Sequence, residues 1–240
     1  MRGLDGLRVL ITGAAGGIGL ACVQRLTAEG ARVAAADLDA PAHADAAVAL
    51  GADVTDPDAA QALVDDARTA LGGLDGLVLA AGIHWTGPTH EMEPAAFARV
   101  MEVSVNGTFH CCRAALPGFL EQGAGRIVTL GSTASLGGAP GLAAYSAAKG
   151  AVLNLTKSIG VEYARAGVRA NCLCPGSTDT PLLRRLMADR ANPDAFRDKH
   201  PIGRFARPEE IAATAAFLLS DEASYFAASA VVVDGGFTGS

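Results

Sequence analysis

Short apolar runs alternate with longer stretches of helical periodicity along this chain. The runs are rich in valine, isoleucine, leucine and alanine, and their length is typical of strands. Six of them predict strands at residues 7–12, 32–36, 77–80, 126–130, 168–174 and 230–233. A seventh, shorter strand is expected to end at Asp53.

Helical patterns fill the intervals between these strands. They predict helices at residues 17–29, 58–71, 94–120, 143–165 and 208–219. This alternation predicts an α/β fold: a doubly wound (Rossmann) parallel sheet of about seven strands, with helices on both faces. We expect one domain over residues 1–240, because no linker or repeat interrupts the pattern. Residues 181–200 break the rhythm, and a long insertion of this kind is often a substrate lid.

Composition and charge exclude several classes of protein. The chain has no run of about eighteen apolar residues, and its first residues lack the features of a signal peptide, so we expect a soluble, cytoplasmic protein without a membrane partner. The formal net charge is −6 and no Lys/Arg-rich stripe is present, which argues against a nucleic-acid partner. A small-molecule ligand is expected instead.

The cysteines favour a reduced compartment. Each lies in an apolar segment, where a free thiol packs as a small hydrophobic group. They are Cys22, Cys111, Cys112, Cys172 and Cys174. Cys172 and Cys174 share one face of an extended stretch, but no further soft ligands lie nearby in the sequence, so no metal site is expected.

A glycine-rich turn from Thr12 to Gly19 joins the first predicted strand to the first helix. This is the context that a dinucleotide-binding loop requires. Because they have no side chain, Gly13, Gly17 and Gly19 let the backbone approach a pyrophosphate, and Ile18 lies between the last two. The helix N-terminus that follows offers free N–H groups. A tight turn without a ligand is the alternative.

Asp37 follows the second predicted strand, about twenty residues after this loop. A carboxylate there can accept hydrogen bonds from both adenosine ribose hydroxyls and would repel a 2′-phosphate. Neither the loop nor the position after Asp37 carries Lys or Arg, so NAD is predicted rather than NADP. The alternative is a solvated residue at a strand end. Asp53 could hydrogen-bond the adenine amino group or cap the next helix, and both roles stay open.

Tyr145 and Lys149 are four residues apart in a helical segment and therefore share a face. To act as a base near neutrality, a phenol must lose about three pKa units, which an adjacent ammonium and an oxidised nicotinamide can supply. Ser132, at the carboxyl end of a strand, can bind the substrate oxygen. Asn106 is a poor helix former in mid-helix, which suits a kink and a water held near Lys149. An exposed helix face is the simpler explanation for the Tyr/Lys pair.

The whole chain resembles the short-chain dehydrogenase/reductase family. The matching residues are the loop from Thr12-Gly13 to Gly19, Asp37, Asp53-Val54, Ala81-Gly82, Asn106, Ser132, Tyr145, Lys149, Asn171, Pro175-Gly176 and Thr180. The resemblance implies a catalytic tetrad of Asn106, Ser132, Tyr145 and Lys149. The cofactor-binding set that it implies is Gly13, Gly17, Ile18, Gly19, Asp37, Asp53, Val54, Ala81, Gly82, Tyr145, Lys149, Pro175, Gly176, Thr178 and Thr180. Thr178 and Thr180 would contact the nicotinamide carboxamide.

Two departures from the family pattern bear on the fold. Leu79 replaces an asparagine after the fourth strand, which we expect to loosen strand-to-helix packing there. Ala227-Ala228 replaces a Thr-Gly pair before the last strand and leaves the form of that turn open.

Within the family, the C-terminal motifs are similar to those of cytosolic (type 2) 3-hydroxybutyrate dehydrogenase, sugar-acid dehydrogenases and 2,3-dihydro-2,3-dihydroxybenzoate dehydrogenases. These groups tend to place an arginine just before the catalytic tyrosine to hold a carboxylate, but residues 137–144 carry no basic side chain. Arg184, Arg185 or Arg190 could substitute, unless they only form a solvated helix face. His84 and Trp85 either line the pocket or lie on an exposed loop.

These features predict an NAD-dependent oxidoreductase that interconverts a small secondary alcohol and its ketone. The alcohol is expected to be a hydroxy acid, a sugar acid or a cyclic alcohol such as a dihydrodiol. Its hydroxyl would give its proton to Tyr145 while hydride passes to the nicotinamide. The alternatives are a ketoreductase of a secondary-metabolite pathway, for which Asp37 is the wrong cofactor residue, and a non-catalytic dinucleotide sensor. The resemblance also implies a homotetramer built through the two long middle helices and the last strand.

Overall fold

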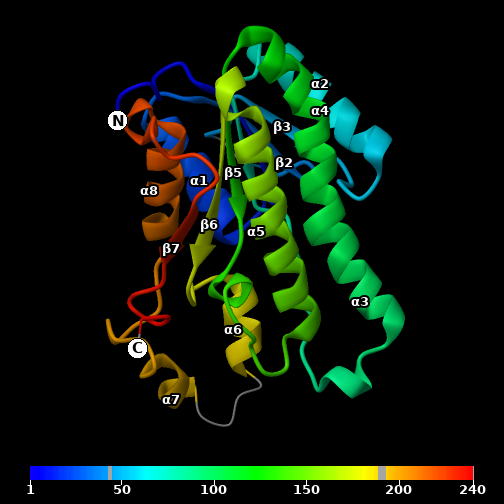
Figure 1. The fold of residues 1–240 in the computed structure, drawn as a ribbon, viewed down its shortest axis with the longest axis vertical. Helices are drawn as coiled ribbons and strands as arrows, with labels where there is room; N and C mark the ends of the chain where they lie inside the picture. Colours follow the sequence, from blue (N-terminus) through cyan, green and yellow to red (C-terminus); the bar gives the residue numbers. More distant parts are fainter. Residues whose placement is uncertain (43–44, 189–192, 240) are drawn as a thin grey trace.

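Seven parallel strands form one sheet in the computed structural model, which describes residues 1–42, 45–188 and 193–239. The strands are β1 Arg8–Thr12, β2 Arg32–Asp37, β3 Val48–Gly51, β4 Gly76–Leu79, β5 Gly125–Leu130, β6 Val168–Pro175 and β7 Ala230–Val233. Their order is β3-β2-β1-β4-β5-β6-β7, so the direction of winding reverses between β1 and β4 (Figure 1). The predicted doubly wound fold is confirmed.

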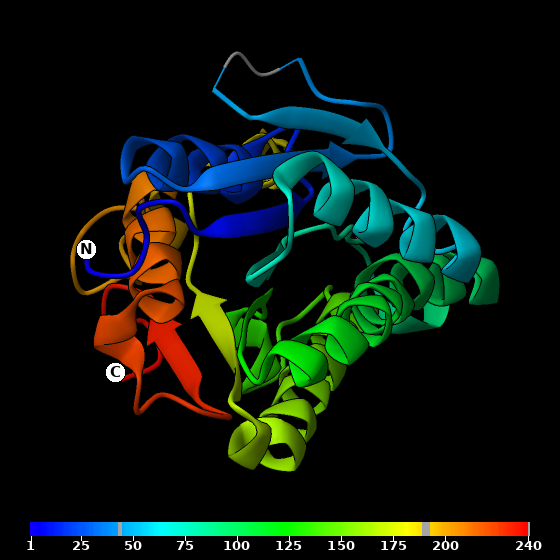
Figure 2. The same ribbon diagram turned by 90° about the horizontal axis from the view of Figure 1, so that it is seen from above.

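Helices cover both faces of this sheet. They are α1 Gly17–Ala28, α2 Pro57–Leu71, α3 Pro94–Met101, α4 Gly107–Gln122, α5 Ala143–Tyr163, α6 Pro181–Ala188, α7 Pro193–Arg197 and α8 Pro208–Leu219. Figure 2 shows α1 and α8 on one face and α2, α4 and α5 on the other. Of the described helices, none combines the length and apolar character that crossing a bilayer requires.

The apolar runs contribute to two core layers at once. In β1, Val9 and Ile11 belong to the buried cluster shared with α1 and α8, whereas Leu10 belongs to the cluster shared with α2 and α4. Successive side chains of a strand point to opposite faces, so a strand covered on both sides is apolar throughout. This explains why the strands stand out in the sequence as continuous apolar runs.

Most predicted elements differ from the structure by one or two residues at an end, and two of the differences have a clear physical reason. The helix predicted at 94–120 is interrupted by a π-helical stretch, Glu102–Asn106, and extends to Gln122. The third strand ends at Gly51 rather than at Asp53. Asp53 Oδ1 accepts hydrogen bonds from the backbone N–H and the hydroxyl of Thr55, and such a local turn competes with continued strand pairing.

The two departures from the family pattern have different outcomes. Leu79 is only 2% exposed and belongs to the core cluster between the sheet and α2 and α4, so the expected loosening was wrong: the leucine fills that space. Ala228 adopts a left-handed backbone with φ of 55°, and its N–H bonds the carbonyl oxygen of Ala170 at 2.8 Å. The turn therefore forms without glycine, although a left-handed alanine costs roughly 1 kcal/mol.

Candidate active site

A large cleft opens at the carboxyl ends of the strands, with a volume of about 1500 Å³. Open α/β sheets bind ligands at this edge, where the winding reverses. The volume exceeds the roughly 300–1,000 Å³ that suits a drug-sized ligand, so a dinucleotide and a small substrate have room together. Every predicted cofactor-binding residue lines this cleft, together with Ser132.

The glycine-rich loop fits a pyrophosphate. Gly13 has a φ of +68°, and a side chain there would lie 2.6 Å from the backbone of Ala80. A side chain on Gly19 would collide with the carbonyl oxygen of Gly13. The first turn of α1 begins after Gly16 and has no side-chain cap, so its N–H groups face the cleft without a side-chain acceptor. Loop and helix together form a cradle for an anion.

Asp37 lies at the end of β2 with its carboxylate fixed by the backbone. Oδ2 accepts a hydrogen bond from the Ala15 N–H at 2.9 Å, and Oδ1 accepts one from the Leu38 N–H at 2.8 Å. A carboxylate has about four acceptor positions, so two remain for ribose hydroxyls. The side chain is therefore anchored at the position where the sequence predicts the adenosine ribose.

Asp53 and Val54 line the cleft near Arg99. Asp53 does not cap α2, because Asp56 does so by accepting hydrogen bonds from the N–H groups of Asp58 and Ala59. The hydrogen bonds from Thr55 lower the pKa of Asp53, and an Arg99 nitrogen lies 3.9 Å from Oδ2. The capping role proposed for Asp53 is thus excluded, and its adenine contact stays a prediction.

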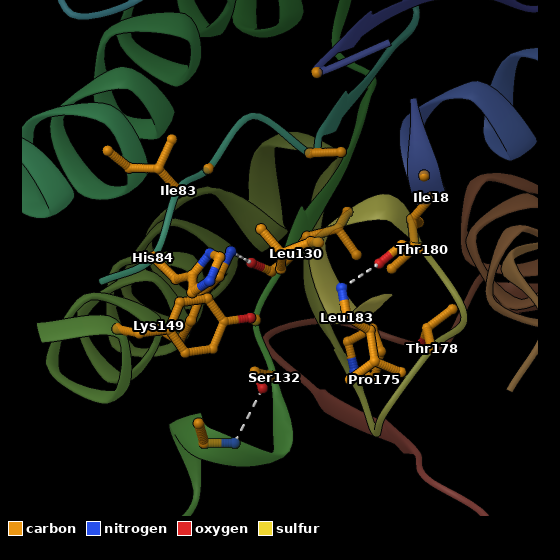
Figure 3. A pocket seen from close by; sticks show the side chains of 18 of the residues that line it. Ile18, Ile83, His84, Leu130, Ser132, Lys149, Pro175, Thr178, Thr180 and Leu183 are labelled. Carbon is orange, nitrogen blue, oxygen red and sulfur yellow. Dashed lines mark hydrogen bonds between the residues drawn. The ribbon is translucent and has the colours of Figure 1, made fainter. Parts of the chain in front are cut away.

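Lys149 lies on α5 with 6% of its surface exposed. Its Nζ donates a hydrogen bond to the Leu130 carbonyl oxygen at 2.7 Å (Figure 3) and lies 5.7 Å from the centre of the Tyr145 ring. Burial lowers the pKa of Lys149 to about 8, so the amine is still mostly charged at neutral pH. The pair shares one face of the helix, as its spacing predicts.

Tyr145 and Ser132 both line the cleft, and the Ser132 hydroxyl is close enough to affect the pKa of the Tyr145 phenol. Burial raises the pKa of Tyr145, and the hydrogen bond with Ser132 opposes this shift only in part. Ser132 Oγ also accepts a hydrogen bond from the Ala134 N–H at 3.1 Å, which fixes its position (Figure 3). The lowered phenol pKa was expected from Lys149 together with an oxidised nicotinamide, and the residues alone do not produce it. The joint effect of both charges stays a prediction.

Asn106 ends the π-helical stretch and does not line the cleft. The interruption expected at this residue is present, but its role in holding a water stays a prediction. Sequence reasoning missed Ser104 in the same stretch, whose buried hydroxyl has no hydrogen-bond partner among the residues that the structure describes. A side chain on Gly82 would lie 3.5 Å from this hydroxyl and 3.4 Å from Lys149 Nζ. Ser104 therefore lies close to Lys149.

Thr178 and Thr180 are buried beside the glycine-rich loop. The Thr178 hydroxyl donates to the Gly176 carbonyl oxygen at 3.0 Å, and the Thr180 hydroxyl accepts from the Leu183 N–H at 3.3 Å (Figure 3). These bonds fix both side chains where the chain enters α6. Their contact with a carboxamide stays a prediction.

The substrate end of the cleft has mostly apolar walls. The lining there includes the two cations Arg185 and Lys199 and, around them, Ile83, His84, Leu136, Gly137, Gly138, Ala139, Pro140, Leu142, Leu182, Leu183, Leu186 and Phe196. Figure 3 shows His84 among the side chains that line this cleft. Trp85 does not line the cleft and instead packs against the cluster that contains Val100 and Ala148. Burial and the charge of Arg185 lower the pKa of His84.

The three lid arginines have different places. Arg184 is bound to Asp179, with Nε 2.7 Å from Oδ1, and does not line the cleft. Arg185 lines it. Arg190 lies outside the described residues.

Comparison with known proteins places this site in a family. The family model described as enoyl-(acyl carrier protein) reductase matches residues 13–238. The 2-(S)-hydroxypropyl-CoM dehydrogenase 3 of Xanthobacter autotrophicus is 43% identical over 244 residues, covering 96% of each chain. Cis-4-hydroxycyclohexanecarboxylate dehydrogenase of Sinomonas cyclohexanicum is 43% identical over 239 residues, covering 95% of each.

Two further proteins extend the comparison. The 2-dehydro-3-deoxy-L-rhamnonate dehydrogenase (NAD(+)) of a Sphingomonas species is 40% identical over 236 residues, covering 95% of this chain and 94% of that protein. The solved aldohexose dehydrogenase of Thermoplasma acidophilum has a TM-score of 0.93 and 31% identity, covering 99% of this chain and 96% of that one. This chain belongs to the short-chain dehydrogenase/reductase family and is an oxidoreductase that acts on CH–OH groups.

Proposed function

We propose that this chain is an NAD-dependent dehydrogenase of small secondary alcohols, with cofactor and substrate sites in one domain over residues 1–240. One observation carries the proposal. Ser132, Tyr145 and Lys149 line one cleft together with the glycine-rich loop and Asp37, and Lys149 Nζ lies 5.7 Å from the centre of the Tyr145 ring. A hydride acceptor bound along the loop would therefore end beside the groups that move the proton.

The choice of NAD rests on Asp37. Its carboxylate is anchored by two backbone N–H groups, so it cannot turn away from a 2′-phosphate without losing them. One relative is named as an NAD(+) enzyme, which supports the same choice. Bound NAD would accept hydride from the carbinol carbon and add positive charge near Tyr145.

The chain's own residues would handle the oxygen and its proton. Tyr145, as its phenolate, would take the proton of the substrate hydroxyl, and NAD, when bound, would supply the acceptor for the hydride. Ser132 donates a hydrogen bond to the substrate oxygen and keeps it in line. Lys149, charged below pH 8, stabilises the phenolate.

The substrate is a small hydroxy acid, sugar acid or cyclic alcohol in this proposal. The apolar walls around Leu136 and Leu182 suit a compact carbon skeleton. The names of relatives specify a hydroxylated cyclohexane ring and a sugar acid, which supports the same range.

A turnover assay tests the proposal. The purified chain is incubated with NAD or NADP and a panel of cyclic alcohols, hydroxy acids and sugar acids, and reduced nicotinamide is followed by absorbance. We expect reduction of NAD with at least one alcohol. A clear preference for NADP would favour the ketoreductase alternative, and binding of NAD without turnover of any alcohol would favour the sensor.

We also propose that the chain forms a homotetramer. Apolar side chains are exposed on the middle helices, including Phe109 on α4, 45% exposed, and Val161 on α5, 73% exposed. These are the elements through which the family resemblance implies assembly.

A further inference from the structure

We propose that the substrate carries an oxyanion, a carboxylate or sulfonate, and that Arg185 and Lys199 bind it. The inference rests on the proposed function, because it concerns the substrate end of the same cleft. It narrows the substrate class to anionic alcohols and assigns their recognition to residues on the segment 181–200.

Charge is distributed unevenly along the cleft. Its acidic lining residues, Asp37 and Asp53, both lie at the predicted adenosine end. Among the described residues that line the substrate end, none is acidic, whereas Arg185 and Lys199 contribute two cations. This contrasts with the formal net charge of −6 for the whole chain. The substrate end is therefore locally positive in an acidic protein.

Arg185 faces the cleft because of its place on α6. Leu182, Arg185 and Leu186 are spaced by three and four residues and all line the cleft, so they form one helix face. The guanidinium lies close enough to His84 for its charge to lower the pKa of that ring, and His84 and Lys149 line the same cleft (Figure 3). An anion bound by Arg185 would thus lie in the cleft that Tyr145 and Lys149 also line.

Arg184, the neighbouring residue on the same helix, is paired with a carboxylate of the protein. Its Nε and one terminal nitrogen donate to the two carboxylate oxygens of Asp179 at 2.7 and 3.1 Å. Arg185 has no ion pair with any residue in the described ranges. Its charge is therefore available to a ligand.

Lys199 provides the second cation, near the C-terminal end of the segment 181–200. It lies three residues after Phe196, and both side chains line the cleft. Within the part of the chain that the structure describes, Lys199 also lacks an ion pair. The facing loop, with Leu136, Pro140 and Leu142, is uncharged. Apolar walls with cations along one side match an apolar carbon skeleton that ends in an oxyanion.

A binding experiment separates this inference from the question of turnover. The affinities of cyclohexanecarboxylate and of cyclohexanecarboxamide, which has the same shape but no charge, are measured by calorimetry with the NAD-saturated enzyme. Benzenesulfonate and benzenesulfonamide serve as a second pair. The same titrations are run on R185Q, K199Q and the neighbouring control R184Q, and at raised salt.

We expect the wild type to bind each anion about tenfold more tightly than its amide, and this ratio to fall severalfold in R185Q and in K199Q but not in R184Q. Raised salt should also reduce the ratio, since both cations are exposed. Equal affinity for anion and amide, absence of anion binding, or the same loss in R184Q as in R185Q would each overturn the inference. Turnover of neutral alcohols alone would leave the proposed function intact while this inference fails. Binding of the anions without turnover of any alcohol would leave this inference intact while the proposed function fails.

Discussion

Asp37 is held by the Ala15 and Leu38 N–H groups, and this anchoring fixes where its negative charge lies. We expect wild-type kcat/KM to favour NAD over NADP by at least about a hundredfold, because an unpaired carboxylate against a phosphate costs several kcal/mol. The substitution Asp37→Ala should lower the efficiency with NAD and narrow the gap. Steady-state kinetics with both cofactors check this, and comparable wild-type efficiencies would refute it.

The burial of Lys149 should make the free energy of unfolding depend on pH. Its pKa is lowered from 10.5 to about 8 by burial, so charging it disfavours the folded state. The free-energy cost of burying the charged amine is complete below pH 8, where the folded and the unfolded state both bind the proton. It disappears above pH 10.5, the ordinary pKa of the amine in the unfolded chain. Relative to Lys149→Met, the wild type should gain roughly 2 kcal/mol in free energy of unfolding between about pH 7 and pH 10.

Urea titrations of both proteins at the two pH values measure this difference. Other titrating groups are the same in wild type and variant, so their effects cancel. A stability difference that does not change with pH would show that the amine is not buried in its charged form.

Single residues differ in how visible their roles are in the sequence. Tyr145 and Lys149 can be paired from their spacing alone, because a helix brings such residues onto one face. Arg184 and Arg185 cannot be told apart in this way, since only the folded position of Asp179 selects one of them. Ser104 gives no signal, because its place beside Lys149 depends on the backbone at Gly82.

At the scale of elements, apolar periodicity predicted the helices better than their interruptions. The π-helical stretch Glu102–Asn106 keeps the helix running with no proline, so the pattern over α3 and α4 looks like one helix. The end of β3 was placed two residues late, because the hydrogen bonds from Thr55 to Asp53, which favour a turn there, are not visible in a propensity pattern.

The helix α6 should become more protected when ligands bind. Its residues Leu182, Leu183 and Leu186 line the substrate end, so a bound substrate would cover them and favour closure of this predicted lid element. We expect amide hydrogen exchange in α6 to slow severalfold on adding NAD with an alcohol that is turned over. The control is α8, which packs against α1 on the outer side of the sheet. Identical exchange in α6 with and without ligands would contradict closure.

At the scale of the molecule, the alternation of strands and helices was enough to predict a doubly wound sheet, since few other architectures bury such a series. The order of strands is harder to obtain. The runs in β4, β5 and β6 are similarly apolar, so the residues alone do not say which strand neighbours β1. That information comes from the way each crossover helix packs.

Assembly can be tested through the exposed face of α5. Light scattering should give a mass near four times 24.2 kDa, about 97 kDa, for the wild type. Val161→Glu places a charge on an exposed apolar position and should reduce this mass to half or less, because charges are depleted from the core of an interface. Ala70→Glu, on the exposed side of α2, is the matched control and should leave the mass unchanged. A wild-type mass near 24 kDa would contradict the tetramer.

The central claim is that Tyr145 accepts the substrate proton, and Tyr145→Phe tests it most directly. The change removes one oxygen and keeps the ring near Lys149. Alcohol oxidation should fall by at least about a thousandfold, while NAD binding by calorimetry changes little. Loss of NAD binding in the variant would mean that Tyr145 is structural. Turnover near the wild-type rate would contradict the account.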